Sequence, residues 1–363
     1  MTKLIWKLFK IVLTLLLAFL MYVVIGGVVP FLHHPDVSQT KKEAVESTQF
    51  YSDSAGPDRA TIIEDNEEAL KMRLRVIKDA KKTLILSTFD FRSDDAGKDV
   101  LAALLNAADR GVKVEIFADG FNSIIQMENN DYFYALSSNG NVKIIIYNQV
   151  NILTPWNGLG RMHDKYVIAD DSLYILGGRN TFGYFLGDYA GHKNYDRDVL
   201  VYNTGSKDSS IYQIKDYYKK ITSQKCCSVF HYNESLGEKN SVKKAEQELK
   251  NRYESLENKY DKFLAENYDY KANTYETNKI NLLSNPTSLY AKQPTVYYGL
   301  MYLAKNAKKE VKIHTPYIIC NDYMYNELKN IKVPTTIMTN SAENNGNIFG
   351  AVDYLNHKKD IIN

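Results

Sequence analysis

Three residues near the middle of the chain have types and a spacing that suit chemistry on phosphorus. His163, Lys165 and Asp170 follow the pattern H-x-K-x-x-x-x-D, and a Gly-Gly-Arg-Asn run follows at 177–180. A neutral imidazole can act as a nucleophile and form a covalent intermediate, which divides one displacement into two steps. A lysine beside it supplies positive charge to the phosphoryl oxygens of the transition state. The motif therefore predicts phosphodiester chemistry, and none of it requires a metal or another cofactor.

The local pattern predicts that the histidine and the lysine project from one face of a strand. Residues 163–169 are rich in β-branched and aromatic types, and alternation along a strand places His163 and Lys165 on the same face. A turn and a second strand at 173–176 should follow. Gly178 then lies where a ligand can approach the backbone closely, and the amide of Asn180 adds an uncharged donor.

A nucleophilic imidazole also needs an acceptor on its other nitrogen to orient it. Residues 195–201 read as a strand that carries two carboxylates, Asp196 and Asp198. The alternative interpretation is a surface histidine and lysine on an edge strand. A pattern of three residues alone arises by chance in about a few per cent of chains. The glycine run and the acidic strand that follow argue against that alternative.

The elements that must position these residues alternate between helix and strand. Residues 67–81 have helical spacing of apolar side chains, and 83–89 form a short β-rich run. A second helix at 99–110 ends at a glycine, and the next strand covers 112–118. This alternation predicts an α/β fold with a largely parallel sheet that helices cover on both faces.

The second half of the chain repeats part of the first. Residues 80–88 resemble 307–315, and 112–119 resemble 333–340, at offsets of 227 and 221 residues. Self-similarity at a nearly constant offset indicates an internal duplication with two lobes side by side. Apolar side chains at helical spacing within 234–278 predict a solvated helical insertion between the lobes. A partner-binding amphipathic helix is the alternative for that segment.

The N-terminus predicts a membrane anchor. Residues 11–32 carry no charge, and three lysines precede them. Twenty-two mostly apolar residues can span a bilayer as a helix, and the basic flank favours a cytoplasmic N-terminus with the body outside. Lys41 and Lys42 weaken that orientation, and a cleaved signal peptide is the alternative to an anchor. The polar segment that follows reads as a linker.

The composition limits the range of partners and metal sites. The formal net charge is only +2, which argues against a strong nucleic-acid binder. Cys226, Cys227 and Cys320 have neither the spacing of a zinc site nor that of a redox pair, so we expect free thiols.

On these residues the chain resembles the phospholipase D superfamily, close to bacterial cardiolipin synthase-like proteins. The likeness runs from about Ile63 to the C-terminus. It rests on the H-x-K-x-x-x-x-D motif, the glycine run after it, Gly111–Val114 and Thr315–Tyr317. The resemblance implies a phospholipase D-like α/β/α sandwich with two lobes that meet at a shared active site, each lobe contributing one motif.

The resemblance also implies roles for individual residues. His163 would be the nucleophile that forms a phosphohistidine, and Lys165 would bind the phosphate. Asp170 would be the structural acid of the motif, and Gly178 and Asn180 would be further phosphate contacts. Asp196 would orient His163, with Asp198 as the second choice.

The second copy of the motif is the point of departure from the family. The duplication places its histidine near position ~384, and the sequence ends at Asn363. His357 and Lys359 have H-x-K spacing, but residues 354–360 read as a helix. We therefore expect that the chain is a fragment with an incomplete second lobe, or that a homodimer supplies the second motif.

The expected organisation has six parts. They are a basic flank at 1–10, a transmembrane anchor at 11–32, a linker at 33–59, a first lobe at 60–232, a helical insertion at 233–278 and an incomplete second lobe at 279–363. The expected function is a membrane-anchored phosphodiesterase or phosphatidyltransferase that acts on phospholipids. A catalytically silent membrane-tethered scaffold and a nuclease of the same superfamily are the alternatives.

Overall fold

A computed structural model describes residues 2–231, 234–264, 268–341, 343 and 348–362. The chain forms two compact units. The first contains residues 1–33, 50–282 and 288–291, and the second contains 34–49, 283–287 and 292–363. The motif lies in the first unit, so this unit is described in more detail.

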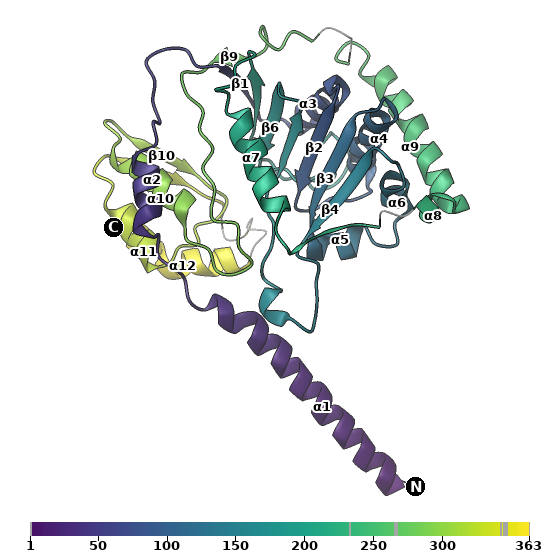
Figure 1. Ribbon diagram of the computed structural model, residues 1–363. Helices are drawn as coiled ribbons and strands as arrows, with labels where there is room; N and C mark the ends of the chain where they lie inside the picture. Colours follow the sequence, from purple (N-terminus) through teal and green to yellow (C-terminus); the bar gives the residue numbers. More distant parts are fainter. Residues whose placement is uncertain (1, 232–233, 265–267, 342, 344–347, 363) are drawn as a thin grey trace. The chain divides into compact units, whose positions relative to one another are not determined.

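A nine-stranded mixed sheet organises the first unit, in the order β8-β4-β3-β2-β5-β6-β7-β1-β9. Helices cover both of its faces (Figure 1). The strands are β1 (Asp58–Ile63), β2 (Thr83–Thr88), β3 (Lys113–Asp119), β4 (Val142–Tyr147), β5 (Tyr166–Ala169), β6 (Leu173–Gly177), β7 (Asp198–Asn203), β8 (Cys227–Val229) and β9 (Tyr275–Glu276). The helices are α3 (Asn66–Asp79), α4 (Asp95–Asp109), α5 (Gly120–Gln126), α6 (Asp131–Ser137), the 3-10 helix η2 (Pro155–Asn157), α7 (Ile211–Thr222), α8 (Glu234–Gly237) and α9 (Asn240–Lys259).

The prediction of a largely parallel sheet is wrong, because only the β2–β3 and β3–β4 pairings of this sheet are parallel. The remaining pairings are antiparallel. A parallel pair needs a crossover of a dozen or more residues, usually a helix, and such helical crossovers join β2 to β3 and β3 to β4. Between β5 and β6 the chain has just three residues, which is enough only for a hairpin.

Two apolar layers hold this sheet between its helices. On one face, α3, α4 and α6 bury their aliphatic side chains against the strands. On the other face, Ile211, Ile214 and Tyr218 of α7 pack on aromatic residues of the sheet. A sheet with an apolar face on each side is stable when helices cover both faces.

Helix α9 belongs to the first unit and does not stand apart from it. It packs on α4 and α6 as an outer layer, visible at the edge of Figure 1. Val242, Leu249 and Leu256 are buried there. The helical spacing in the predicted insertion thus reflects intramolecular packing of an amphipathic helix.

The second unit contains a helix-strand-helix-strand arrangement like that of α3-β2-α4-β3. Strands β10 (Val311–His314) and β11 (Thr335–Met338) are parallel, with helices α10 (Thr295–Lys305), α11 (Asp322–Lys329) and α12 (Ile348–Ile362). Helix α2 (Gln39–Glu46) packs on α10, so the expected linker contains a helix. His357 lies on α12, where its ring stacks on Tyr325.

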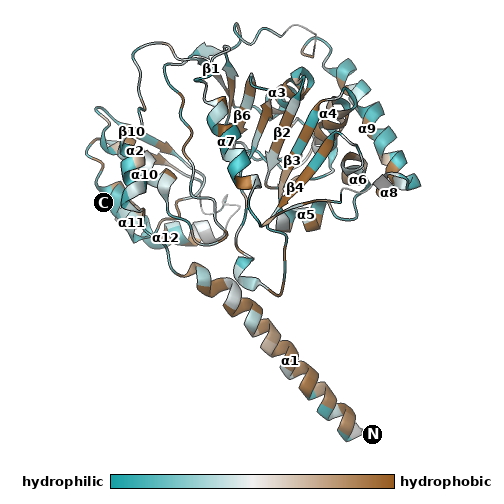
Figure 2. Ribbon diagram, viewed as in Figure 1, coloured by the Kyte–Doolittle hydropathy of each residue, from teal (hydrophilic) through white to brown (hydrophobic). Residues whose placement is uncertain are grey.

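The N-terminal helix α1 (Thr2–Val28) continues into the 3-10 helix η1 (Val29–Phe31). Residues 3–31 are long and apolar enough to cross a membrane. The apolar side chains of this span are exposed along its length, and Figure 2 shows them as a brown helix. An exposed apolar surface of this size is stable in lipid and not in water, so α1 is compatible with a membrane anchor.

Candidate active site

The motif lies where β2 and β3 end and β5 begins. Tyr166, the first residue of β5, pairs with Ser87 of β2 and with Leu176 of β6. Strand β5 begins three residues later than the sequence predicts, so His163 and Lys165 lie before the strand and not in it. In open α/β sheets, ligands bind beyond the carboxyl ends of the parallel strands. The motif is at that position relative to β2 and β3.

The side chains of the histidine and the lysine are in contact. Lys165 Nζ lies 3.1 Å from His163 Nδ1 and donates to the His163 carbonyl oxygen at 2.6 Å. The Phe89 ring lies beside the imidazole, with centroids 4.4 Å apart. His163 retains an exposed surface, whereas Lys165 is only 5% exposed. A nucleophile that solvent can reach therefore lies next to a buried cation.

Both groups have lowered pKa values. Desolvation by the surrounding protein lowers the pKa of His163 to about 4, and the charge of Lys165 acts in the same direction. Burial lowers the pKa of Lys165 to about 8, against the opposing effect of nearby carboxylates, with Asp164 first and Asp196 second. At neutral pH the imidazole is neutral and most of the lysine is charged. These are the protonation states that a nucleophile and a phosphate ligand require.

The contact also determines the histidine tautomer in this state. An ammonium has donors only, so Nδ1 accepts and the proton of the neutral ring is on Nε2. Attack through Nε2 requires that Lys165 leaves Nδ1 and that the proton moves there. A phosphate that binds Lys165 would remove the ammonium from the ring.

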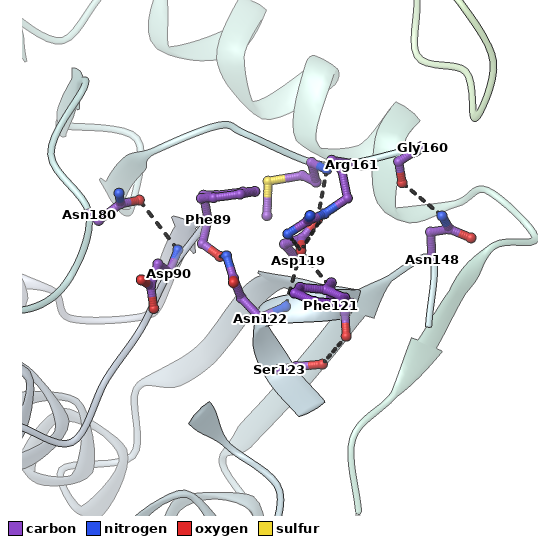
Figure 3. A network of polar contacts seen from close by, with 12 residues as sticks. Phe89, Asp90, Asp119, Phe121, Asn122, Ser123, Asn148, Gly160, Arg161 and Asn180 are labelled. Carbon is purple, nitrogen blue, oxygen red and sulfur yellow. Dashed lines mark hydrogen bonds and ion pairs between the residues drawn. The ribbon is translucent and has the colours of Figure 1, made fainter. Parts of the chain in front are cut away.

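A network around Asp119 holds the segment that leads to His163 (Figure 3). Arg161 Nη2 and Nε donate to Asp119 Oδ1 at 2.6 and 2.9 Å, and Met162 N donates to Oδ2 at 3.0 Å. The Arg161 guanidinium also lies 4.9 Å from the centroids of both Phe89 and Phe121. Asp119 caps the N-terminus of α5 as well. One buried carboxylate thus connects the end of β3 to the residues directly before the motif.

Asn180 lies on the other side of the site. Its Oδ1 accepts from the Asp90 backbone N at 3.3 Å, which is drawn in Figure 3. That bond orients the amide, so that Nδ2 of Asn180 is the group that can donate to a ligand. Arg179, the residue before it, is buried and pairs with Asp198 at 3.2 Å. Residues 179 and 180, which end the glycine run, are therefore held in place by contacts with Asp90 and Asp198.

Asp170 is not part of this cluster. Its carboxylate accepts from the backbone N–H groups of Lys81, Lys82 and Thr83 at 2.8–2.9 Å. Five residues of strand separate it from Lys165, or about 16 Å at 3.3 Å per residue. The residue also adopts a left-handed backbone conformation with φ of 53°. In this structure Asp170 ties the start of β2 to the β5–β6 turn.

The structure does not bring Asp196 to the imidazole. Among the described residues no hydrogen bond joins Asp196 to His163, and Asp196 Oδ1 instead accepts from the Arg197 backbone N. Asp198 is buried and pairs with Arg73 and Arg179. Neither carboxylate therefore has the orienting position expected for it.

The glycine run has a structural reason that the sequence does not reveal. A Cβ on Gly178 would come 2.1 Å from Asp196 Oδ2, and one on Gly177 would come 1.8 Å from Asp198 Oδ1. The space beside these glycines is thus filled by the start of β7. The phosphate contact expected of Gly178 stays a prediction. Its donor would be the backbone N–H of Gly178.

Four residues of the site were not singled out from the sequence: Phe89, Asp90, Asp119 and Arg161. The first three follow β2 or end β3, at the carboxyl ends of parallel strands. The rule that ligands bind beyond the carboxyl ends of parallel strands could have identified these three residues from the sequence. Nothing in the sequence indicates that Arg161 pairs with Asp119, because 41 residues separate the two.

The fold and the motif lead to comparisons with known proteins. Residues 74–221 match the family described as cardiolipin synthase, PLD-like domain. The solved structure of phosphatidylserine synthase from Haemophilus influenzae shares the fold, with a TM-score of 0.54 at 14% identity. It covers 88% of this chain and 72% of that one. The mixed α/β sheet with its helical layers is thus a phospholipase D fold.

Curated relatives support the same family. Cardiolipin synthase B of Salmonella typhi is 31% identical over 144 residues, which cover 39% of this chain and 34% of the relative. An uncharacterized protein of Helicobacter pylori is 26% identical over 309 residues, which cover 78% and 59%. The chain spans about a third of the length of that synthase and about three fifths of the Helicobacter protein. The family match at residues 74–221, these relatives and the fold together support a member of the phospholipase D superfamily.

Proposed function

We propose that this protein is a membrane-anchored phosphodiesterase or phosphatidyltransferase that acts on phospholipids. The observation that carries the proposal is the contact between a neutral, accessible His163 and a buried, charged Lys165 at the carboxyl ends of β2 and β3. The similarity of residues 74–221 to the cardiolipin synthase domain favours a phospholipid substrate. The apolar helix α1 favours a site at a membrane.

In the proposed reaction, a nitrogen of His163 attacks the phosphorus of the lipid phosphodiester. A P–N bond forms, the P–O bond to the head-group alcohol breaks, and that alcohol takes a proton as it leaves. Lys165 and Asn180 bind the non-bridging oxygens, where negative charge develops. Water or an acceptor alcohol then attacks the phosphatidyl-histidine, which breaks the P–N bond and returns the histidine. Water gives hydrolysis, and an alcohol such as phosphatidylglycerol gives transfer.

The departing alcohol needs a proton donor, which typically contributes about 10²–10⁴-fold to the rate. We propose that His163 of a second copy of the chain supplies it, since the resemblance implies a shared active site to which two motifs contribute. We also propose that the N-terminus is cytoplasmic and the body lies outside, because Lys3, Lys7 and Lys10 precede the apolar span.

The test uses the full chain in vesicles that contain labelled phosphatidylglycerol. We expect wild type to release or transfer the labelled phosphatidyl group and His163→Asn to lose this activity by at least about 10³-fold. His192→Asn is the matched control, because His192 is exposed and lies outside the site. Acid quenching should trap labelled protein in the wild type and not in His163→Asn.

Three outcomes would contradict the proposal. Equal turnover by wild type and His163→Asn would exclude His163 as the nucleophile. Turnover by neither, with both proteins folded, would favour the silent scaffold. Plasmid cleavage that is lost in His163→Asn, without lipid turnover, would favour the nuclease.

A further inference from the structure

Two segments beside the site expose apolar side chains and carry no charge. One is the loop 148–160 between β4 and β5, and the other is helix α5. Leu153 is 66% exposed and Leu159 is 55% exposed. We call this surface the apolar rim and define it by Phe121, Ile125, Ile152, Leu153, Trp156 and Leu159, all of which are exposed. Large apolar residues that cluster on a surface usually mark a contact with a protein or a membrane.

The two segments form one surface. Asn148 Nδ2 donates to the carbonyl oxygens of Asn157 and Gly160, both at 2.7 Å, which closes the loop on itself. Arg161 stacks on Phe121 of α5. Figure 3 shows the Asn148–Gly160 bond and Phe121 beside Arg161. The rim is thus held in shape by the same residues that lead to His163, three positions after Gly160.

The rim contacts the helix that could span the membrane. Tyr22 of α1 donates its hydroxyl to the Leu153 carbonyl oxygen at 2.8 Å. The rings of Tyr22 and Trp156 lie edge to face with centroids 6.5 Å apart. Gly26 lies against Pro155, and a Cβ on that glycine would come 2.7 Å from Pro155 Cγ. In Figure 1 the loop reaches the C-terminal part of α1. Whatever surrounds this part of α1 therefore also surrounds the rim at Leu153 and Trp156.

The length of α1 places this contact at a bilayer boundary. From Lys3 to Tyr22 the helix rises about 28 Å at 1.5 Å per residue, and the hydrocarbon core of a bilayer is about 30 Å thick. Tyrosine and tryptophan gather at such boundaries because their rings are amphipathic. If the hydrocarbon core of the bilayer begins at Lys10 instead, it ends near Pro30, and the rim then lies deeper in the bilayer. Both registers put Trp156 within or at the edge of the lipid.

We propose that the apolar rim inserts into the bilayer leaflet that the C-terminal end of α1 reaches. The rim would contact the acyl chains and the interfacial region of the lipids, and not a protein partner. The insertion would hold the mouth of the site at the level of the head groups, so that a phospholipid reaches His163 from within its leaflet. The inference goes beyond the proposed function, since it does not require that the protein is an active enzyme.

The chain has only two tryptophans, Trp6 and Trp156, which makes a fluorescence test specific. In Trp6→Phe the full chain reports on the rim alone. We expect its emission to be blue-shifted in phosphatidylglycerol-containing vesicles and quenched at least about twofold by lipids brominated on the acyl chains. Trp156→Phe reports on α1 and shows whether the protein is inserted.

A second variant tests the rim itself. Adding Leu153→Asp and Leu159→Asp to Trp6→Phe should remove most of the quenching and shift the emission to the red. The thermal unfolding of this protein should be unchanged, because both leucines are exposed. Tyr275→Asp is the matched control, since Tyr275 is 77% exposed and lies on β9 at the far edge of the sheet.

The outcomes separate this proposal from the catalytic one. Unquenched Trp156 in a protein whose Trp6 is quenched would show that the loop packs on α1 outside the bilayer, which would overturn the inference. Quenching that persists in the double aspartate variant would also overturn it. Quenched Trp156 without any lipid turnover would support the rim while the proposed function fails.

Discussion

At the scale of single residues, His163 and Lys165 act as a pair because they are in contact and burial lowers the pKa of both. The lysine charge adds to desolvation in keeping the imidazole neutral, and the surrounding carboxylates keep the buried lysine charged below a pH of about 8. A free lysine would stay charged over a much wider range. The pair is therefore competent over a limited window of pH.

This pair predicts a bell-shaped pH dependence of kcat/KM. Activity should rise as His163 loses its proton through about pH 4 and fall as Lys165 loses its proton through about pH 8. In Lys165→Arg the alkaline limb should disappear, because a guanidinium stays charged, and turnover should be lower. The measurement is initial rate against pH with a lipid substrate. Lys98→Arg, outside the site, should keep both limbs, and an alkaline limb that persists in Lys165→Arg would exclude Lys165 as its origin.

At the scale of elements, the site depends on carboxylates that join strand ends to each other. Asp119 connects the end of β3 to the segment before β5, and Asp170 connects the β5–β6 turn to the start of β2. Both accept backbone N–H groups that no strand partner satisfies at these ends. A hydrogen bond to a charged group typically contributes about 1.5–3 kcal/mol to stability, and less where solvent can replace it. The acid of the motif thus holds strand ends of the sheet together in this structure.

We therefore expect Asp170→Ala to lower the free energy of unfolding by about 1–3 kcal/mol, because three backbone donors lose their acceptor. Its kcat/KM at low temperature should stay within a few fold of wild type. The measurement is urea unfolding in detergent together with turnover. Asp171→Ala is the control, since it loses only an exposed ion pair with Lys215, worth less than about 1 kcal/mol. Lost turnover at unchanged stability would show instead that Asp170 takes part in the reaction.

At the scale of the whole molecule, the H-x-K-x-x-x-x-D motif occurs only in the first unit among the residues that the structure describes. The second unit repeats the helix-strand-helix-strand opening of the first, and its His357 lies on helix α12 and not on a strand. A complete site on the superfamily pattern needs a second histidine, and our proposal is that another copy of the chain supplies it.

Mixing experiments test this pairing of copies. If two His163 side chains share one site, co-reconstituted wild type and His163→Asn in equal amounts should form random pairs. Activity should then fall to about a quarter of that of the same total amount of wild type. Chains that act alone would retain about half. The measurement is lipid turnover at a constant total protein-to-lipid ratio, and a fall in simple proportion to the wild-type fraction would contradict the shared site.

The sequence by itself determined the features that depend on local pattern. The motif around His163, the alternation of helix and strand from α3 to β3, and the apolar helix α1 all follow from residue type and period. Only the tertiary structure decided what depends on which strands meet. It made most of the strand pairings antiparallel, joined Arg161 to Asp119, packed α9 on α4, and directed Asp196 Oδ1 to the Arg197 backbone N. Local period reports which face of an element is apolar, whereas pairing depends on packing between segments far apart in the chain, which no local pattern records.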